Sequence, residues 1–169
     1  MINKKYDLVY ADPPWKVRKT IRKVRPNQKR NLDYSTLSLG EIKEIMQDYN
    51  SDILFLWTTD KFLFEAETIG KELGYTLHTR IIWNKKNGMC PAFTIRFTHE
   101  YLLWFYKKGK LMPIAKEATG KFTSVITEKP TRHSAKPLKA YELIEALYPN
   151  HSKIELFARN KRDGWDSWG

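Results

Sequence analysis

The chain has 169 residues, of which 41% are hydrophobic and 14% aromatic; this is enough for a buried core and excludes a wholly disordered chain. The one cysteine, Cys90, excludes a disulfide framework and a multi-cysteine zinc site, and no apolar run is long enough for a membrane span or a signal peptide. Because 30 Lys and Arg residues face 19 Asp and Glu residues, the formal net charge is +11, which favours nucleic acid over a membrane as the partner.

Apolar runs and helical periodicities alternate along the chain. A capping-box pair, Ser38 and Glu41, precedes the first helical pattern, Gly74 suits the position after the second helix, and Pro137 and Pro149 bracket the third. This alternation indicates an α/β fold with a mostly parallel sheet, and no repeat or linker divides the predicted single domain over residues 1–169. Strands are predicted over residues 6–10, 52–57, 79–83, 101–106 and 153–157, helices over 39–49, 62–73 and 137–147, and a polar tail after the last strand.

The segment 16–31 holds eight basic residues and no acidic one. Like charges at this density repel one another, and Pro26 would end the weak helical stripe that the segment contains. We therefore expect a mobile loop that becomes ordered against phosphate groups. Its basic residues are Lys16, Arg18, Lys19, Arg22, Lys23, Arg25, Lys29 and Arg30.

The motif Asp12-Pro13-Pro14-Trp15 directly follows the first predicted strand, and parallel sheets bind ligands beyond the carboxyl ends of their strands. Since proline has no backbone N–H, Asp12 and the Pro13 carbonyl are suited to accept both hydrogens of an amino group on a flat ring, while Trp15 stacks on that ring. The two acceptors would localise the nitrogen lone pair for attack on a methyl sulfonium. The alternative is that the prolines form only a sharp loop and that Trp15 is a core anchor.

Further segments accompany this motif: YSTLSLGEIKEI at 34–45, SDILFLWTTD at 51–60, RFTHEYLLWF at 96–105, RHSAKPLKAYELIEALYP at 132–149 and KIELFARNKRDGWDSWG at 153–169. With them, the sequence resembles the 70-kDa-subunit family of mRNA adenosine methyltransferases, including its short prokaryotic and phage members. The resemblance implies a Rossmann-like, S-adenosylmethionine-dependent methyltransferase with a circularly permuted motif order, in which the catalytic motif comes first and the cofactor strand last. It also implies methyl transfer to the 6-amino group of adenine.

The resemblance assigns roles to particular residues. Lys136 matches a lysine expected to pair with the methionine carboxylate of the cofactor, and Arg159 matches a ribose-contacting position. Both roles suit the chemistry, because lysine is a point charge and arginine offers several donors to hydroxyl groups. The expected catalytic residues are Asp12, Pro13, Pro14 and Trp15; the cofactor-binding residues are Asp12, Lys136, Glu155, Arg159 and Arg162; and the substrate-binding residues are Trp15, Arg18, Lys19, Arg22, Tyr34 and His133.

No metal site is expected. The pair His99-Glu100 lacks the second histidine of a zinc HExxH motif, because residue 103 is leucine. Glu100 is instead expected to pair with Arg96 at the start of a strand.

The expected substrate is adenine in DNA, held single-stranded or flipped out of a duplex so that the base reaches the motif. RNA is the alternative substrate, and a non-catalytic nucleic-acid-binding subunit or a plain binding module is the alternative role. A small domain has little surface for reading a sequence, so we expect either a homodimer or low sequence specificity. The expected location is the cytoplasm of a bacterial cell or of a phage-infected host.

Overall fold

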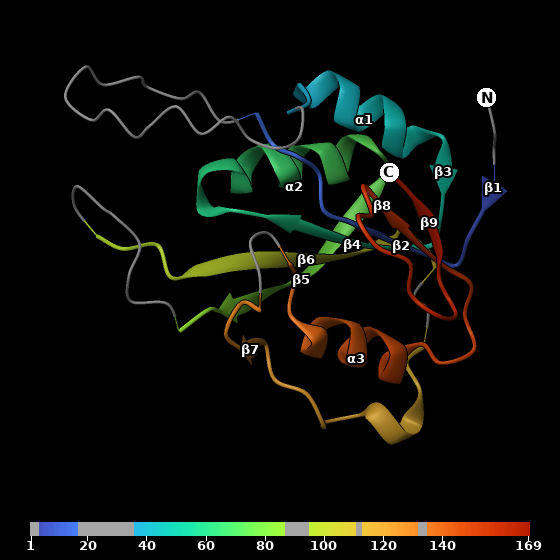
Figure 1. The fold of residues 1–169 in the computed structure, drawn as a ribbon. Coiled ribbons are helices and arrows are strands. Elements are labelled where there is room, and N and C mark those ends of the chain that lie inside the picture. The colour runs from blue at the N-terminus through green and yellow to red at the C-terminus, as the bar shows by residue number, and fades with distance from the viewer. Residues whose placement is uncertain (1–3, 17–35, 87–94, 111–112, 132–134) are drawn as a thin grey trace, which may run out of the picture.

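The computed structural model describes residues 4–16, 36–86, 95–110, 113–131 and 135–169. A seven-stranded sheet forms the middle layer, with α1 and α2 on one face and α3 on the other (Figure 1). The helices are α1 (Leu39–Gln47), α2 (Leu63–Glu72) and α3 (Leu138–Leu147), and single 3-10 turns cover Asp60–Phe62 and Lys116–Ala118. The strands are β1 (Lys4–Lys5), β2 (Leu8–Ala11), β3 (Tyr49–Asn50), β4 (Ile53–Thr58), β5 (Tyr75–Asn84), β6 (His99–Lys107), β7 (Val125–Thr127), β8 (Lys153–Leu156) and β9 (Asp166–Trp168).

The strand order of the large sheet is β7-β5-β6-β4-β2-β8-β9. Strand β6 is antiparallel to both of its neighbours, and the other four pairings are parallel. The predicted α/β fold with a mostly parallel, Rossmann-like sheet is therefore confirmed. Strand β2, which precedes the Asp12 motif, lies directly beside β8 near the end of the chain, as the permuted motif order requires.

The central strands are buried because helices cover both faces of the sheet. Every residue of β2 and β4 is buried, which explains their nearly continuous apolar sequences. One core cluster lies between the sheet and helices α1 and α2, and the second lies between the sheet and α3. Helix α2 approaches β6 closely at Gly70, where a Cβ atom would lie 2.5 Å from the Phe105 ring.

The helix boundaries follow the local signals with small shifts. Ser38 and Glu41 form the predicted capping box of α1. Gly74 follows α2 with φ of +84°, the left-handed conformation in which glycine is favoured. Pro137 is the N-cap of α3 rather than its first helical residue, and the Glu128 carboxylate accepts the free N–H groups of Leu138 and Lys139 at 2.9 and 3.0 Å.

Two predicted boundaries and the predicted tail were wrong. Helix α1 ends at Gln47 because residues 49–50 pair with β1, and β5 begins at Tyr75, four residues before the predicted strand. The polar tail contains a strand, since Asp166–Trp168 pairs in parallel with β8 as an edge strand whose three residues are exposed. Such a short, polar edge strand has no apolar alternation by which the sequence could indicate it.

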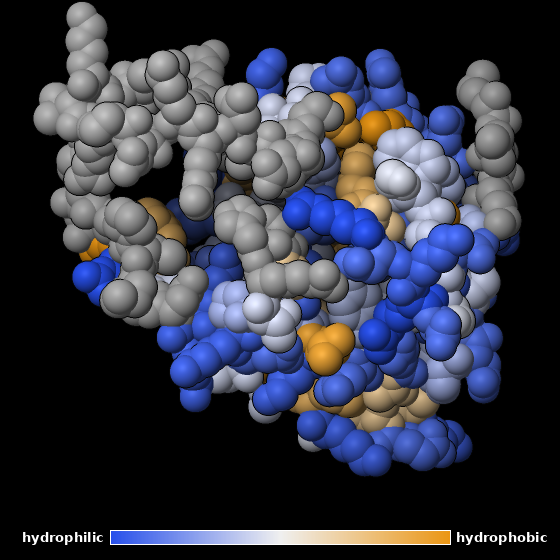
Figure 2. Space-filling model, in the orientation of Figure 1, coloured by the Kyte–Doolittle hydropathy of each residue, from blue (hydrophilic) through white to orange (hydrophobic). Residues whose placement is uncertain are grey.

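The surface is largely hydrophilic, with small separate apolar patches on the face shown in Figure 2. Among the residues that the structure describes, no helix combines the length and the apolar character needed to cross a membrane.

Candidate functional site

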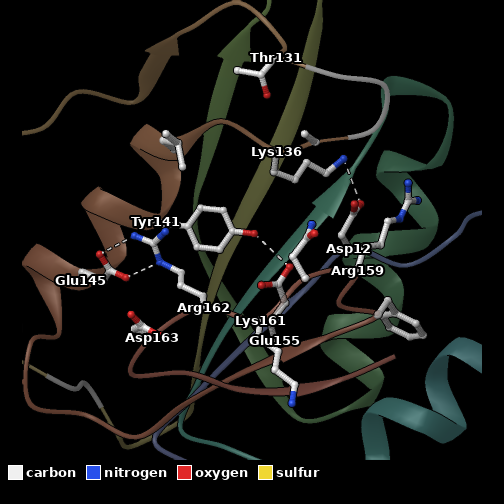
Figure 3. A pocket seen from close by; sticks show the side chains of 14 residues that line it. Asp12, Thr131, Lys136, Tyr141, Glu145, Glu155, Arg159, Lys161, Arg162 and Asp163 are labelled. Carbon is white, nitrogen blue, oxygen red and sulfur yellow. Dashed lines mark hydrogen bonds and ion pairs between the residues drawn. The ribbon is translucent and has the colours of Figure 1, made fainter.

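The carboxyl ends of β2 and β8 and the start of α3 surround a cavity of about 1120 Å³. Ligands of Rossmann-like sheets bind at this edge, beyond the carboxyl ends of the strands. Figure 3 shows the labelled side chains around the cavity, which come from the ends of both strands, from α3 and from the segments that precede α3 and follow β8. The lining residues are Asp12, Thr131, Ala135, Lys136, Leu138, Tyr141, Glu145, Glu155, Phe157, Arg159, Asn160, Lys161, Arg162 and Asp163.

The loop after β2 is held in place by its own backbone and by Trp15. The Pro13 carbonyl accepts the Trp15 N–H at 2.9 Å, and the Pro14 carbonyl accepts the Leu37 N–H at 3.0 Å. The Trp15 indole donates to the Trp57 carbonyl at 3.1 Å and stacks on Phe62, with ring centroids 5.6 Å apart. Trp15 is only 8% exposed and belongs to the core cluster under α1 and α2. It therefore anchors the loop that presents Asp12, and one face of its indole is already covered.

Lys136, which lines the cavity, joins two carboxylates. Its Nζ lies 3.0 Å from Asp12 Oδ1 and 2.8 Å from Glu100 Oε2, and it sits 5.2 Å from the centroid of the Trp57 ring. Lys85 forms an ion pair with the other oxygen of Glu100. The side chains of Lys136, Glu100 and Asp12 are 12%, 13% and 19% exposed, so these charges interact with little screening by water. Four alternating charges thus form a chain, Lys85–Glu100–Lys136–Asp12.

Burial and pairing shift the three inner groups in different directions. Burial raises the pKa of Asp12 above its ordinary value, because it outweighs the opposing attraction of Lys136, and the Glu100 charge raises it further. Burial would also raise the pKa of Glu100, but Lys136 and Lys85 together lower it. Burial would lower the pKa of Lys136, but the two carboxylates raise it. Of the two carboxylates that pair with Lys136, Asp12 is therefore the one whose pKa is raised.

A second polar group lines the wall formed by α3. The Tyr141 hydroxyl donates to Glu155 Oε1 at 3.0 Å, and the Arg162 guanidinium lies 4.6 Å from the centre of the Tyr141 ring. Arg162 also donates to both oxygens of Glu145 at 2.6 and 2.9 Å, and the Trp165 indole donates to Glu145 at 2.9 Å. Burial raises the pKa of Glu155, so this carboxylate, like Asp12, is poorly solvated. These contacts fix Arg162 against the cavity wall (Figure 3).

The strand end at Phe157 has an unusual backbone. Phe157 lines the cavity with φ of +63°, a left-handed conformation that is uncommon for a bulky residue. The turn is held by β9, because the Trp168 carbonyl accepts the Ala158 N–H at 2.9 Å and the rings of Phe157 and Trp168 are 5.5 Å apart. Strand β9 therefore fixes the turn that presents Arg159 to the cavity.

The structure brings together all five residues expected to bind a cofactor: Asp12, Lys136, Glu155, Arg159 and Arg162 line one cavity. The expected substrate residues Arg18, Lys19, Arg22, Tyr34 and His133, and positions 17–31 of the basic segment, lie outside the described residues.

The expected pairing of Glu100 with Arg96 was wrong. The side chain of Glu100 lies on the α3 side of β6, where it pairs with Lys136 and Lys85. Sequence reasoning missed Tyr141 and Glu145 as cavity residues. Their spacing of four residues places them on one face of α3, and this spacing was the feature of the sequence from which their shared position could have been predicted.

A cavity at the carboxyl edge of a mostly parallel sheet, lined by paired charges, defines a ligand-binding protein of the Rossmann-like class. The chain belongs to the MT-A70 methyltransferase family, whose model matches residues 6–169.

Individual relatives match almost the whole chain. It is 33% identical over 184 residues to the Type II methyltransferase M.MunI of Mycoplasma sp, a match that covers 98% of this chain and 77% of that protein. It is 30% identical over 180 residues to the N(6)-adenosine-methyltransferase catalytic subunit METTL3 of Homo sapiens, covering 98% of this chain and 28% of that protein. A putative N(6)-adenosine-methyltransferase MT-A70-like of Medicago truncatula is 28% identical over 174 residues, with 98% and 26% covered. The chain thus spans about a quarter of the length of these two plant and animal relatives.

Membership of this family implies methylation that depends on S-adenosylmethionine, and the cavity residues fit that molecule. S-Adenosylmethionine carries an ammonium group, a carboxylate, a sulfonium and a ribose diol. The cavity offers carboxylates from Asp12 and Glu155 for the cationic groups and hydroxyls, and donors from Lys136 and Arg159 for the carboxylate and the ribose. Its volume of about 1120 Å³ slightly exceeds the range of about 300–1,000 Å³ usual for small-molecule sites.

Proposed function

We propose that this protein is an adenine N(6)-methyltransferase that acts on DNA as a single domain. One observation carries the proposal: the carboxylate of Asp12 lines the cavity, poorly solvated and fixed by Lys136, on a loop that Trp15 anchors. The printed names of the plant and animal relatives state N(6)-adenosine methylation. DNA is favoured because the bacterial relative named as a Type II methyltransferase matches over most of its length, and because DNA is expected for the short prokaryotic members that the sequence resembles.

The cavity residues divide the work of binding and chemistry. Lys136 has three donor hydrogens, of which Asp12 and Glu100 engage two, so the third is left for the carboxylate of the cofactor. Arg159 and Glu155 are suited to the ribose hydroxyls, and Arg162 stays fixed on Glu145. When bound, S-adenosylmethionine supplies the methyl group.

Asp12 acts on the amino group of the target base. Its carboxylate accepts one N–H hydrogen, which draws the nitrogen lone pair away from the ring and toward the methyl carbon. As the new N–C bond forms, the carbon–sulfur bond of the donor breaks and the amino nitrogen becomes positively charged. The nitrogen then loses one proton, and Asp12 is suited to accept it because burial raises its pKa.

RNA is the second candidate substrate, and the matches to N(6)-adenosine-methyltransferases over 98% of the chain favour it. The discriminating experiment incubates the protein and S-adenosylmethionine with single-stranded DNA, duplex DNA and RNA of matched sequence, followed by mass spectrometry of the nucleosides. We expect N(6)-methyladenine in a DNA product. Product on RNA alone would identify RNA rather than DNA as the substrate. No product on any of the three would refute the proposed activity.

The role of Asp12 is tested by Asp12→Ala. We expect kcat to fall by at least about 100-fold, because the variant loses both the acceptor and the proton-accepting group. Nucleic-acid affinity should remain within about twofold, since Asp12 contacts no phosphate in this mechanism. Asp48→Ala is the matched control, because Asp48 is an exposed aspartate at the far end of α1. Retention of activity by Asp12→Ala would rule out the assigned role.

A further inference from the structure

The carboxyl edge of the sheet has a second side, which the cavity does not use. The cavity lies on the side of α3, whereas three large apolar residues that do not line it are exposed at the same edge. Phe64 in the first turn of α2 is 80% exposed, and Ile95 and Phe97, which lead into β6, are 67% and 52% exposed. None of the three lines the cavity, and none is among the residues expected from the sequence to bind substrate.

The sheet topology places these residues at one end of the sheet. Along β6, Tyr101, Leu103 and Phe105 pack into the core cluster under α1 and α2, while Glu100 reaches Lys136 on the α3 side. Ile95, Arg96 and Phe97 come just before the first residue of β6, His99, and all three are exposed. Tyr101 lies opposite Thr58 at the end of β4, a few residues before α2 begins at Leu63. Figure 1 shows the starts of α2 and β6 at the same end of the sheet.

Cations are interleaved with these apolar residues. Arg96 lies between Ile95 and Phe97 and is exposed, as are Lys61, one turn before Phe64, and Lys86 at the end of β5. Exposed aromatic rings combined with cations are the pattern of surfaces that stack the bases of single strands and hold their phosphates. The aromatic ring predicted for stacking, Trp15, is buried under Phe62, whereas Phe64 and Phe97 are exposed aromatic residues among those that the structure describes at this edge.

We propose that Phe64, Phe97 and Arg96 form a binding surface for the nucleotides that flank the target base. This inference rests on the proposed function, because it requires a nucleic-acid substrate. A base that enters the site leaves its stacked neighbours behind. Phe64 and Phe97 stack on those neighbours, and Arg96 binds a phosphate between them. The nucleic acid then approaches from the α2 side while the cofactor occupies the α3 side, and the two meet at Asp12.

The test uses the full chain and a fluorescently labelled single-stranded DNA containing adenine, with binding followed by anisotropy at several salt concentrations. Phe64→Ala and Phe97→Ala should each weaken binding about fivefold or more without changing the salt dependence, because stacking releases no counterions. Phe64→Trp should retain affinity. Arg96→Gln should lower the slope of log K against log salt by about 0.7, the value of one phosphate contact on a single strand.

Phe122→Ala is the matched control, because Phe122 is an exposed phenylalanine before β7 and should leave affinity unchanged. Thermal stabilisation by S-adenosylmethionine should be equal in all variants, which shows that each one is folded and that the cavity is intact. Wild-type affinity in both Phe64→Ala and Phe97→Ala would overturn the inference alone. Unchanged affinity with an altered oligomeric state in sedimentation would identify a protein contact instead and would also overturn it. A wild-type protein that neither binds nor methylates nucleic acid would overturn the proposed function itself.

Discussion

Neighbouring charges shift the pKa values of single residues at the site, and the effect of Glu100 on Asp12 is the clearest case. Its negative charge contributes to the raised pKa of Asp12, so Glu100→Gln should lower that pKa. The acid limb of the pH–rate profile of methyl transfer should then move to lower pH, because Asp12 remains ionised at lower pH than in the wild type. Lys85→Gln should move the limb to higher pH, since it leaves the Glu100 charge less compensated. Single-turnover rates across pH test both, and limbs that coincide with the wild type would leave Glu100 without this positioning role.

The same residue should make stability depend on pH. The pKa of Glu100 is below its ordinary value of 4.5 in the folded protein. Its contribution to folding is therefore fully present above that ordinary value and is lost as the pH falls through the lowered pKa. Glu100→Gln removes the group, so the fall in Tm between neutral and acidic pH should be shallower than in the wild type. Thermal melts of both proteins across this range measure the difference, and parallel curves would contradict it.

The residues of the cavity were predictable to the extent that they follow strand ends. Asp12, Glu155 and Arg159 come after or within the last residues of β2 and β8, and those strand ends meet at one edge. The pairing of Glu100 with Lys136 was not predictable, because these residues are 36 positions apart and meet only through the insertion of antiparallel β6 beside β4. The place of Trp15 was equally open, since a tryptophan after two prolines is compatible with stacking and with packing.

Among the elements, α2 is fixed on the sheet by a glycine. A Cβ atom at Gly70 would lie 2.5 Å from the ring of Phe105, which is fully buried. Gly70→Ala should therefore lower the free energy of unfolding by about 1–3 kcal/mol through overpacking. Gly40→Ala in α1 is the matched control: its Cβ would meet only Ser38 Oγ at 4.0 Å, so alanine should be neutral or stabilising there. Urea titrations of both variants measure this difference in stability. Equal midpoints for the two variants would show that the Phe105 ring shifts to accommodate the added methyl group.

The elements that sequence reasoning missed are short strands: the separate pair β1 and β3, and β7 and β9 at the two edges of the large sheet. Strands β7 and β9 have three residues each, and β9 is exposed throughout. The long central strands were recognisable because burial on both faces demands continuous apolar residues, as in β4. An edge strand is not under this demand, so β9 was interpreted as a tail although it holds the Phe157 turn beside the cavity.

For the molecule as a whole, the excess of positive charge predicts that binding to nucleic acid depends strongly on salt. The basic segment 16–31 directly follows the Asp12 motif in sequence, so its cations should contact phosphates next to the reacting base. Changing Arg18, Lys19, Arg22 and Lys23 to Gln should weaken binding to every sequence and reduce the slope of log K against log salt by up to about 3 on single strands. The matched control changes four lysines at the opposite edge of the sheet, Lys5, Lys71, Lys108 and Lys110, which lowers the net charge equally. If both sets reduced the slope alike, the charge would act as a general field rather than through contacts of this segment.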